Sequence, residues 1–436
     1  MPLDMYKDCC RVHTSKDKLV DEKLVRKIER QANHRTKLLA SILNLGQNGD
    51  KERWEIALKA VDSKASTETF HIKDHKPIPE GADIPDTRGI CNGKEGPISR
   101  LQCVTSLWLD KYAGKLEGGE GCINTRDMKE GFEDVNNDPP EDGKKRILLS
   151  LDVEKMYPSL KKDTVIHEIY QVIRHSDISV LNLNWKMLTL YLLHKVDKAK
   201  LNSFGLTPIM PIKKPGTGPG LTEDNYIWNQ IKPSEAQLRK MLGLLASDLI
   251  DFLMSNHTYT VGEEVYLQLF GGPIGLDLTR VLARILMIIF DQRFKAGMKQ
   301  RAPDSDLKLA KRFMDDKNIV IDIPISDKNS MIQESETATL VKEVADEIFP
   351  DMFTVTVDHP SNHPDKKMPI LDLKCWIDDE QKVKYIFYKK PVSYQGVIRA
   401  DTGLSKSSIK AILYSEGMQR LYNCSRDLDW SYKLPE

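Results

Sequence analysis

The stretch "ILLSLDVEKMYPSL", residues 147–160, combines an apolar run with a carboxylate and an aromatic residue. The run before the carboxylate is apolar except for one serine, which is typical of a strand buried in a sheet. Asp152 comes directly after this run, and Tyr157 follows five positions later. A side chain at the end of a buried strand has a rigid mounting, so Asp152 is a candidate catalytic or metal-binding residue.

A second carboxylate site lies in "RFMDDKNIVI", residues 312–321, between two segments that we expect to be strands. Aspartate favours turns for reasons of its own backbone, so Asp315 and Asp316 alone would more often be a solvated turn than a metal site. With Asp152 the chain offers three carboxylates beside hydrophobic strands. Carboxylate and phosphate oxygens bind Mg²⁺, and two such ions stabilise both the attacking and the leaving oxygen in phosphoryl transfer.

These two stretches resemble motifs A and C of the reverse transcriptase family, in which a tyrosine usually stands at the position of Phe313. Further segments resemble the family's fingers segment, its motif B and the motif at its palm–thumb junction, all in the family's order. They are "FHIKDHKPIPEGADIPDTRGI" (70–90), "QLFGGPIGLDLTRVLARI" (268–285), and "MPILDLKCWID" (368–378) followed by "YIFYKKP" (385–391).

The segments "IKDHKP", "NHTYTVGEEVYLQLFGGPIG" and "ILDLKCW" are most similar to the Penelope-like branch of retroelement reverse transcriptases. The resemblance covers about residues 70–425, the polymerase part. It implies an RNA-directed DNA polymerase, a nucleotidyltransferase that extends a DNA primer on an RNA template with dNTPs. Penelope-like elements commonly encode a GIY-YIG nuclease as well. We find no such stretch here, so we expect extension of a supplied primer without nicking of DNA.

The resemblance assigns the metal ligands. Asp152 and Asp315 would bind two Mg²⁺ ions (or Mn²⁺), together with the main-chain carbonyl of Val153. Asp316 would be the less essential neighbour.

In the fingers segment, the resemblance makes Lys73 and Arg88 the candidates for contacts with the triphosphate, and Lys76 a second candidate. Arginine suits planar, bidentate phosphate binding, and lysine acts as a point charge. Without the order of the motifs, a solvated loop would be the better interpretation.

In motif B, Gly271, Gly272, Pro273 and Gly275 would form a turn in which missing side chains let the backbone approach a nucleotide or the template–primer. A plain loop that enters a helix is the alternative.

The resemblance places Tyr157 beneath the sugar of the incoming nucleotide, where an aromatic ring leaves no room for a 2′-hydroxyl. This favours DNA synthesis over RNA synthesis. A core tyrosine is the alternative.

Lys389 and Lys390 would lie along the duplex backbone, in a tail with ten Lys/Arg and five Asp/Glu from residue 381 to 436. An exposed charged strand is an equally good interpretation.

Three further positions depart from the family pattern. Gly89 and Asp277 each stand where the family often has proline, and Lys317 directly follows the aspartate pair. Lys317 could pair with Asp316 and draw its charge away from the metals.

The fold class that we predict is α+β, a right-hand polymerase with fingers, palm and partial thumb, whose antiparallel palm sheet is backed by helices. We expect an N-terminal helical region at 1–69, fingers and palm at 70–377, and a palm–thumb junction with a partial thumb at 378–436. The segment from about 175 to 232 is longer than usual between motifs A and B, and its sequence indicates no function.

Composition sets further limits. Lys plus Arg equals Asp plus Glu at 64 each, and the seven cysteines include no CxxC pair, so neither a zinc module nor a disulfide framework is indicated. No apolar run reaches the length of a membrane helix, and we expect a soluble, intracellular protein without a membrane partner. Two alternatives to a reverse transcriptase remain: an inactive or domesticated relative that still binds nucleic acid, and an RNA-templated RNA polymerase, which Tyr157 disfavours.

Overall fold

The computed structural model divides the chain into two compact units, Met1–Leu116 with Met156–Leu286, and Glu117–Lys155 with Met287–Glu436. Both units are discontinuous in sequence, and the sequential division at 69/70 and 377/378 stays a prediction. The structure describes residues 3–44, 65–72, 87–92, 96–116, 121, 124–176, 183–203, 205–206, 211–218, 220–228, 232–327, 329–388 and 405–425.

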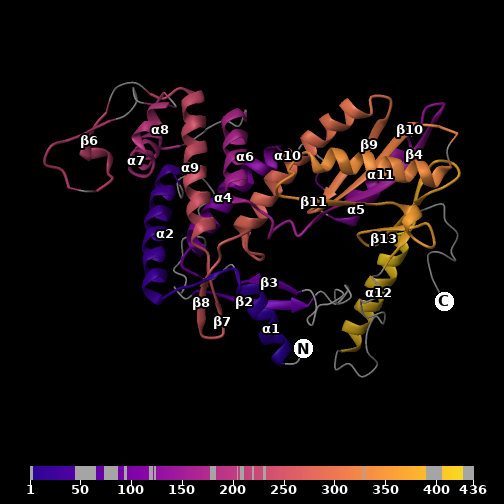
Figure 1. Ribbon diagram of the computed structural model, residues 1–436, viewed down its shortest axis with the longest axis horizontal. Helices are drawn as coiled ribbons and strands as arrows, with labels where there is room; N and C mark the ends of the chain where they lie inside the picture. Colours follow the sequence, from indigo (N-terminus) through magenta and orange to yellow (C-terminus); the bar gives the residue numbers. More distant parts are fainter. Residues whose placement is uncertain are drawn as a thin grey trace. The chain divides into compact units, whose positions relative to one another are not determined.

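Helices dominate the first unit. Helix α9 packs against α6, α7 and α4, and α2 packs against α4 and α7 (Figure 1). A capping box starts α9, in which the side chains of Ser234 and Gln237 bond reciprocally to each other's main-chain N–H. The helices are α1 (Leu3–Thr14), α2 (Glu22–Ile42), α4 (Ser99–Leu116), α6 (Lys162–His175), α7 (Trp185–Lys195), α8 (Lys198–Ser203), α9 (Glu235–Ser255) and the 3₁₀ turn η2 (Glu223–Asn225).

The strands of the first unit form a five-stranded sheet in the order β1–β8–β7–β2–β3. All its pairs are antiparallel except β2 with β7, which is parallel. The long segment between motifs A and B contributes α7 to the helical core and a small hairpin of β5 and β6. The bounds are β1 (Lys18–Leu19), β2 (Ser66–Ile72), β3 (Thr87–Cys91), β5 (Ile212–Lys213), β6 (Tyr226–Ile227), β7 (Thr258–Val261) and β8 (Glu264–Leu267).

The second unit is built on an antiparallel four-stranded sheet in the order β11–β4–β10–β9. A three-stranded antiparallel sheet, β12–β13–β14, shares a hydrophobic core with α5 and the four-stranded sheet. The strands are β4 (Lys144–Glu154), β9 (Asp306–Phe313), β10 (Asp316–Pro324), β11 (Thr354–Asp358), β12 (Met368–Ile370), β13 (Leu373–Ile377) and β14 (Val383–Phe387).

Helices back this sheet, as the sequence predicts. Helix α11 contacts β4 and β11 (Figure 1). Helix α10 begins in the first unit, and its Asp291 accepts hydrogen bonds from buried side chains of β9 and β10. Gly297 of α10 lets α11 approach, because a Cβ there would lie 2.8 Å from Val344. The remaining helices are α5 (Thr125–Asn136), α10 (Asp277–Arg301), α11 (Ser330–Asp346), α12 (Lys406–Tyr422) and the 3₁₀ turn η3 (Pro360–Asn362).

The mixed helix and strand content and the antiparallel sheet are confirmed, whereas the division into fingers, palm and thumb stays a prediction. Among the described residues, no helix has the length and apolar character needed to cross a bilayer.

Candidate active site

Two of the three candidate carboxylates lie directly opposite each other. Strands β4 and β10 are antiparallel, and their register pairs Asp152 with Asp316. Residues that oppose each other in such a pair project from the same face of the sheet. Asp152 is exposed and Asp316 is half-buried, so both carboxylates lie at the open end of this strand pair.

The same face becomes progressively buried away from these carboxylates. Ser150 lies opposite Asn318, and its hydroxyl donates a 3.1 Å hydrogen bond to the Asn318 side chain. Next come Leu148 and Val320, which belong to the core shared with α5. A slip of one residue would move all these side chains to the opposite face, so the register that aligns Asp152 with Asp316 is set by the packing below them.

The buried end of the face is fixed by Arg146 and Asp322, which also oppose each other in the register. Both side chains are fully buried and form a bidentate ion pair, with Nε–Oδ1 at 2.8 Å and Nη2–Oδ2 at 3.0 Å. The three other N–H groups of Arg146 donate to the main-chain oxygens of Val135, Asp138 and Gln381. All five donors of this guanidinium are therefore satisfied.

The third carboxylate lies at the tip of a hairpin. Phe313 pairs with Asp316, which leaves Met314 and Asp315 as a two-residue turn. Met314 has φ +56°, a conformation that disfavours residues with a Cβ by about 1–2 kcal/mol. Strain of this kind is concentrated at functional sites, and here it occurs where Asp315 and Asp316 follow in succession.

A buried charged cluster attaches this hairpin to α10. Asp291 of α10 accepts hydrogen bonds from Arg312 Nε at 2.8 Å and from Lys317 Nζ at 2.6 Å. Arg312 also donates to the main-chain oxygen of Met314 at 3.2 Å. The hairpin is therefore anchored on both sides of its turn.

Lys317 has a buried acidic partner in Asp291, and its pairing with Asp316 stays a prediction. Successive side chains of a strand point to opposite faces, so Lys317 turns away from the face of Asp316. It is fully buried, its ammonium contacts Asp291, and it lies 5.4 Å from the ring centre of Phe294. Lys317 is therefore part of the buried charged cluster beneath the hairpin.

The carboxylates fit a hard divalent cation. Like charges directly opposite each other on a sheet are destabilising, and a cation next to Asp152 and Asp316 would remove that repulsion. Magnesium is usually held by one or two carboxylates, with water and phosphate oxygens completing its shell. Among the described residues, no three His, Cys, Asp or Glu side chains are gathered as a preformed metal cage.

Tyr157 belongs to the first unit, whereas Asp152 belongs to the second. Its side chain is half-buried, and its main-chain oxygen accepts hydrogen bonds from Gly272 N at 2.8 Å and Leu160 N at 3.3 Å. The end of motif A is therefore attached to motif B within the first unit. The contact of Tyr157 with a sugar stays a prediction.

The glycines of motif B are required by the chain's own backbone. Gly271 has φ +71°, and a Cβ there would lie 2.4 Å from the Pro158 carbonyl oxygen. Gly275 has φ +98°, and a Cβ there would lie 2.3 Å from the Cys91 carbonyl oxygen. Cys91 in turn donates its N–H to the Ile274 oxygen at 2.8 Å. These approaches support the helix-entry reading, and contact of this turn with a nucleotide stays a prediction.

The basic candidates are described only in small part. Arg88 lies in β3, where its main chain pairs with His71 of β2. Lys73, Lys76, Lys389 and Lys390 lie outside the described residues, so their roles stay predictions.

Sequence reasoning missed the residues that position the site, chiefly Arg146, Asp291 and Asp322. Asp291 and Asp322 each carry a signal, because a charged residue inside an apolar run must be paired when it is buried. The sequence "LMIIFDQRF" contains Asp291 in such a run, and "NIVIDIP" contains Asp322.

Comparison with known proteins gives distant similarities only. No family model and no curated protein matches the sequence. Telomerase from Candida albicans in complex with a TWJ fragment of telomeric RNA is 10% identical over 95% of this chain and 55% of its own, with a TM-score of 0.47. Apo telomerase from Candida tropicalis is 12% identical over 84% of this chain and 54% of its own, with a TM-score of 0.41.

The BmCPV RNA-dependent RNA polymerase at its quiescent state is 12% identical over 84% of this chain and 26% of its own, with a TM-score of 0.40. The chain spans about half the length of the telomerase chains that it matches. These neighbours are polymerases, but the similarity is too low to carry a functional argument, which therefore rests on the geometry of the carboxylates.

Proposed function

We propose that this protein is a nucleic-acid polymerase that extends a primer by nucleotidyl transfer, and specifically a reverse transcriptase of the Penelope-like type. The observation that carries the proposal is the alignment of Asp152 with Asp316 across β4 and β10, with Asp315 in the adjoining turn. A rigid sheet thereby holds two carboxylates on one face and mounts a third beside them.

Asp152 and Asp315 would hold two Mg²⁺ or Mn²⁺ ions, with help from the Val153 carbonyl, and Asp316 would be the less essential ligand beside them. When bound, such ions stabilise the attacking 3′-oxygen of a primer and the leaving pyrophosphate oxygen. The residues of this chain supply placement. Arg146 with Asp322 fixes the register, and the buried Asp291 cluster fixes the hairpin.

The choice of DNA over RNA as product rests on Tyr157, which would exclude a 2′-hydroxyl. The main-chain oxygen of Tyr157 accepts a hydrogen bond from Gly272 of motif B, which restrains the backbone that carries the ring. The substrates are then an RNA template, a DNA primer and dNTPs. The remaining proposed contacts are Lys73, Lys76 and Arg88 for the triphosphate, the turn of Gly271, Gly272, Pro273 and Gly275 for the nucleotide, and Lys389 and Lys390 for the duplex.

Primer extension tests this function. Asp152→Asn and Asp315→Asn should each lower kcat by about a thousandfold or more, because metal-borne stabilisation is worth several kcal/mol and each 1.4 kcal/mol is tenfold. Asp304→Asn is a matched control, since Asp304 is an exposed carboxylate of the same unit that lies before β9. It should leave kcat unchanged. Near-normal extension by Asp315→Asn would refute the metal assignment.

The choice of substrates in the same assay separates the alternatives. Extension with dNTPs on RNA supports a reverse transcriptase, and extension with NTPs alone supports an RNA polymerase. Binding of primer–template without any extension by the wild type would support an inactive relative.

A further inference from the structure

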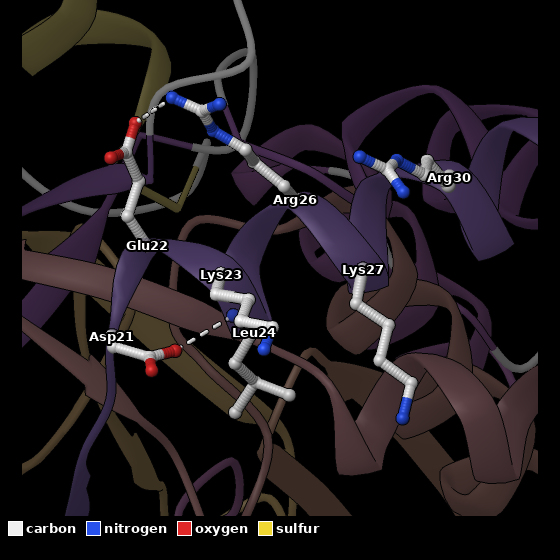
Figure 2. Close-up of a pocket in the computed structure, with 7 residues that line it drawn as sticks. All are labelled: Asp21, Glu22, Lys23, Leu24, Arg26, Lys27 and Arg30. Atoms are coloured by element: carbon white, nitrogen blue, oxygen red, sulfur yellow. Dashed lines mark hydrogen bonds and ion pairs between the residues drawn. The ribbon is translucent and has the colours of Figure 1, made fainter.

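The outer face of α2 carries a line of positive charge that the proposed catalytic site does not use. Lys23, Lys27, Arg30 and Lys37 are all exposed. Their spacing of four, three and seven residues places them within an arc of about 80° and over about 21 Å of helix, given 3.6 residues per turn and 1.5 Å per residue. We call these four residues the α2 stripe. Figure 2 shows three of them, Lys23, Lys27 and Arg30, following one another along the helix.

The opposite face of α2 holds the helix in place. Val25, Ile28, Ala32 and Leu39 are buried there, where α2 packs against α4 and α7. The stripe therefore sits on a helix whose inner face is fixed in the first unit. Its cations lie on a stable surface.

Among the described residues, no acidic side chain forms an ion pair with three of the four cations of the stripe. Within the part of the chain that the structure describes, Lys23, Lys27 and Arg30 form no ion pair. Glu22 instead pairs with Arg26 at 2.7 Å, to one side of the stripe (Figure 2). The first turns of α2 line a surface pocket, whose lining includes these three cations together with Arg26 and the acidic Asp21 and Glu22.

A solvated helix face usually alternates in sign, but the sequence along this arc contains no acid. Like charges three or four residues apart destabilise a helix by about 0.2–0.5 kcal/mol per pair. The stripe is also not a consequence of a basic protein, because the chain has no net charge. A single-sign line on a neutral protein indicates a polyanionic partner.

We propose that the α2 stripe binds the phosphate backbone of a single strand of RNA. One line of cations along a convex helix matches one line of phosphates, and each contact releases counterions from the strand. The identification of this strand as RNA, and as the template, rests on the proposed polymerase function, whereas the binding of a single line of phosphates does not.

The test compares two triple variants by the salt dependence of binding. The stripe variant is Lys23→Gln/Lys27→Gln/Arg30→Gln. Glutamine has nearly the helix propensity of lysine and arginine, so α2 should persist. The control variant is Lys213→Gln/Lys214→Gln/Lys232→Gln, which removes the same charge from exposed sites of the same unit. Circular dichroism confirms that both are folded.

The probe is a fluorescein-labelled single-stranded RNA of about 30 nucleotides, titrated by anisotropy from about 50 to about 300 mM KCl. Each phosphate contact contributes about 0.7 to the slope of log K against log salt for a single strand. The stripe variant should lose about 2 from this slope and bind roughly a hundredfold more weakly at about 0.1 M salt. The control should match the wild type. Equal slopes for the two variants, or no RNA binding by the wild type, would overturn the proposal.

Two further experiments separate the stripe proposal from the proposed polymerase function and from binding to a membrane surface. Extension of a short primer at saturating primer–template tests the polymerase. If the wild type does not extend but the stripe variant alone loses RNA binding, the stripe proposal holds and the proposed function fails. Vesicles rich in phosphatidylserine provide a second anionic surface. Vesicle binding that depends on the stripe, with an unchanged RNA slope, would assign the stripe to a membrane surface and overturn the proposal.

Discussion

Replacing Arg146 with methionine should leave the Asp322 carboxylate without its ion-pair partner at the buried end of the β4–β10 pair. Both side chains are fully buried, and two of the five hydrogen bonds donated by Arg146 go to Asp322. The other three go to main-chain oxygens, which would lose their donor. The substitution therefore removes a charge partner and leaves polar groups unsatisfied in one step.

The size of the effect follows from these contacts. Breaking a buried ion pair by removing one partner costs about 3–5 kcal/mol, and each buried acceptor without a donor adds a further penalty of about 1–3 kcal/mol. Arg146→Met should therefore destabilise the protein by about 5 kcal/mol or more. Adding Asp322→Leu removes the stranded carboxylate, so this second substitution should regain about 2–3 kcal/mol.

Urea denaturation of the wild type, both single variants and the double variant gives the coupling free energy directly. Lys308→Met is the control, because it removes a cation from an ion pair with the exposed Asp138, which solvent screens. It should have a much smaller effect. A double variant that unfolds at lower urea than Arg146→Met would refute the claim that the unpaired Asp322 carboxylate causes much of the loss.

Four further predictions concern the site and its supports. Asp291→Asn leaves two buried cations without their carboxylate and should cost about 3–5 kcal/mol in urea denaturation, and a loss below about 1 kcal/mol would contradict the anchoring role. Gly271→Ala should lower Tm more than Gly262→Ala, because both glycines have positive φ but only the Cβ at Gly271 meets a carbonyl, at 2.4 Å, and equal shifts would show that this contact relaxes freely. Complete burial lowers the pKa of His257 from 6.5 to about 4, so the unfolded state binds a proton that the folded state does not as pH falls through this window. The wild type should then lose up to about 3 kcal/mol relative to His257→Gln between pH 7 and pH 4, and a constant difference in urea denaturation would contradict the burial effect. Tyr157→Ala should raise the ratio of kcat/KM for NTPs to that for dNTPs by about tenfold, since overpacking costs about 1–3 kcal/mol, and an unchanged ratio would return Tyr157 to a packing role.

The sequence predicted the elements that carry the candidate site, because each has a strong local signal. The apolar run before Asp152 is β4, and the two strands flanking Asp315 are β9 and β10. Period and length suffice to predict such elements.

The alignment of Asp152 with Asp316 could not be predicted from local patterns. It depends on Arg146 meeting Asp322, which lies 176 positions away in the chain. Register depends on which side chains pack together in the folded unit, and no spacing within either strand reveals that partner. The placement of Lys317 is different, since successive residues of a strand alternate between its two faces, and Lys317 therefore lies on the face of β10 opposite Asp316.

The β4–β10 pair explains how two carboxylates of like charge can be kept opposite each other. Repulsion between Asp152 and Asp316 acts at the open end of the pair, where water screens it, while the fully satisfied Arg146–Asp322 pair holds the buried end. The Asp291 cluster in turn holds the hairpin, so the strained Met314 turn persists although its own backbone disfavours it. Because stability is supplied below the site, the carboxylates need not contribute to it. A cation that neutralises them should therefore raise the free energy of unfolding, as binding to the folded state alone requires.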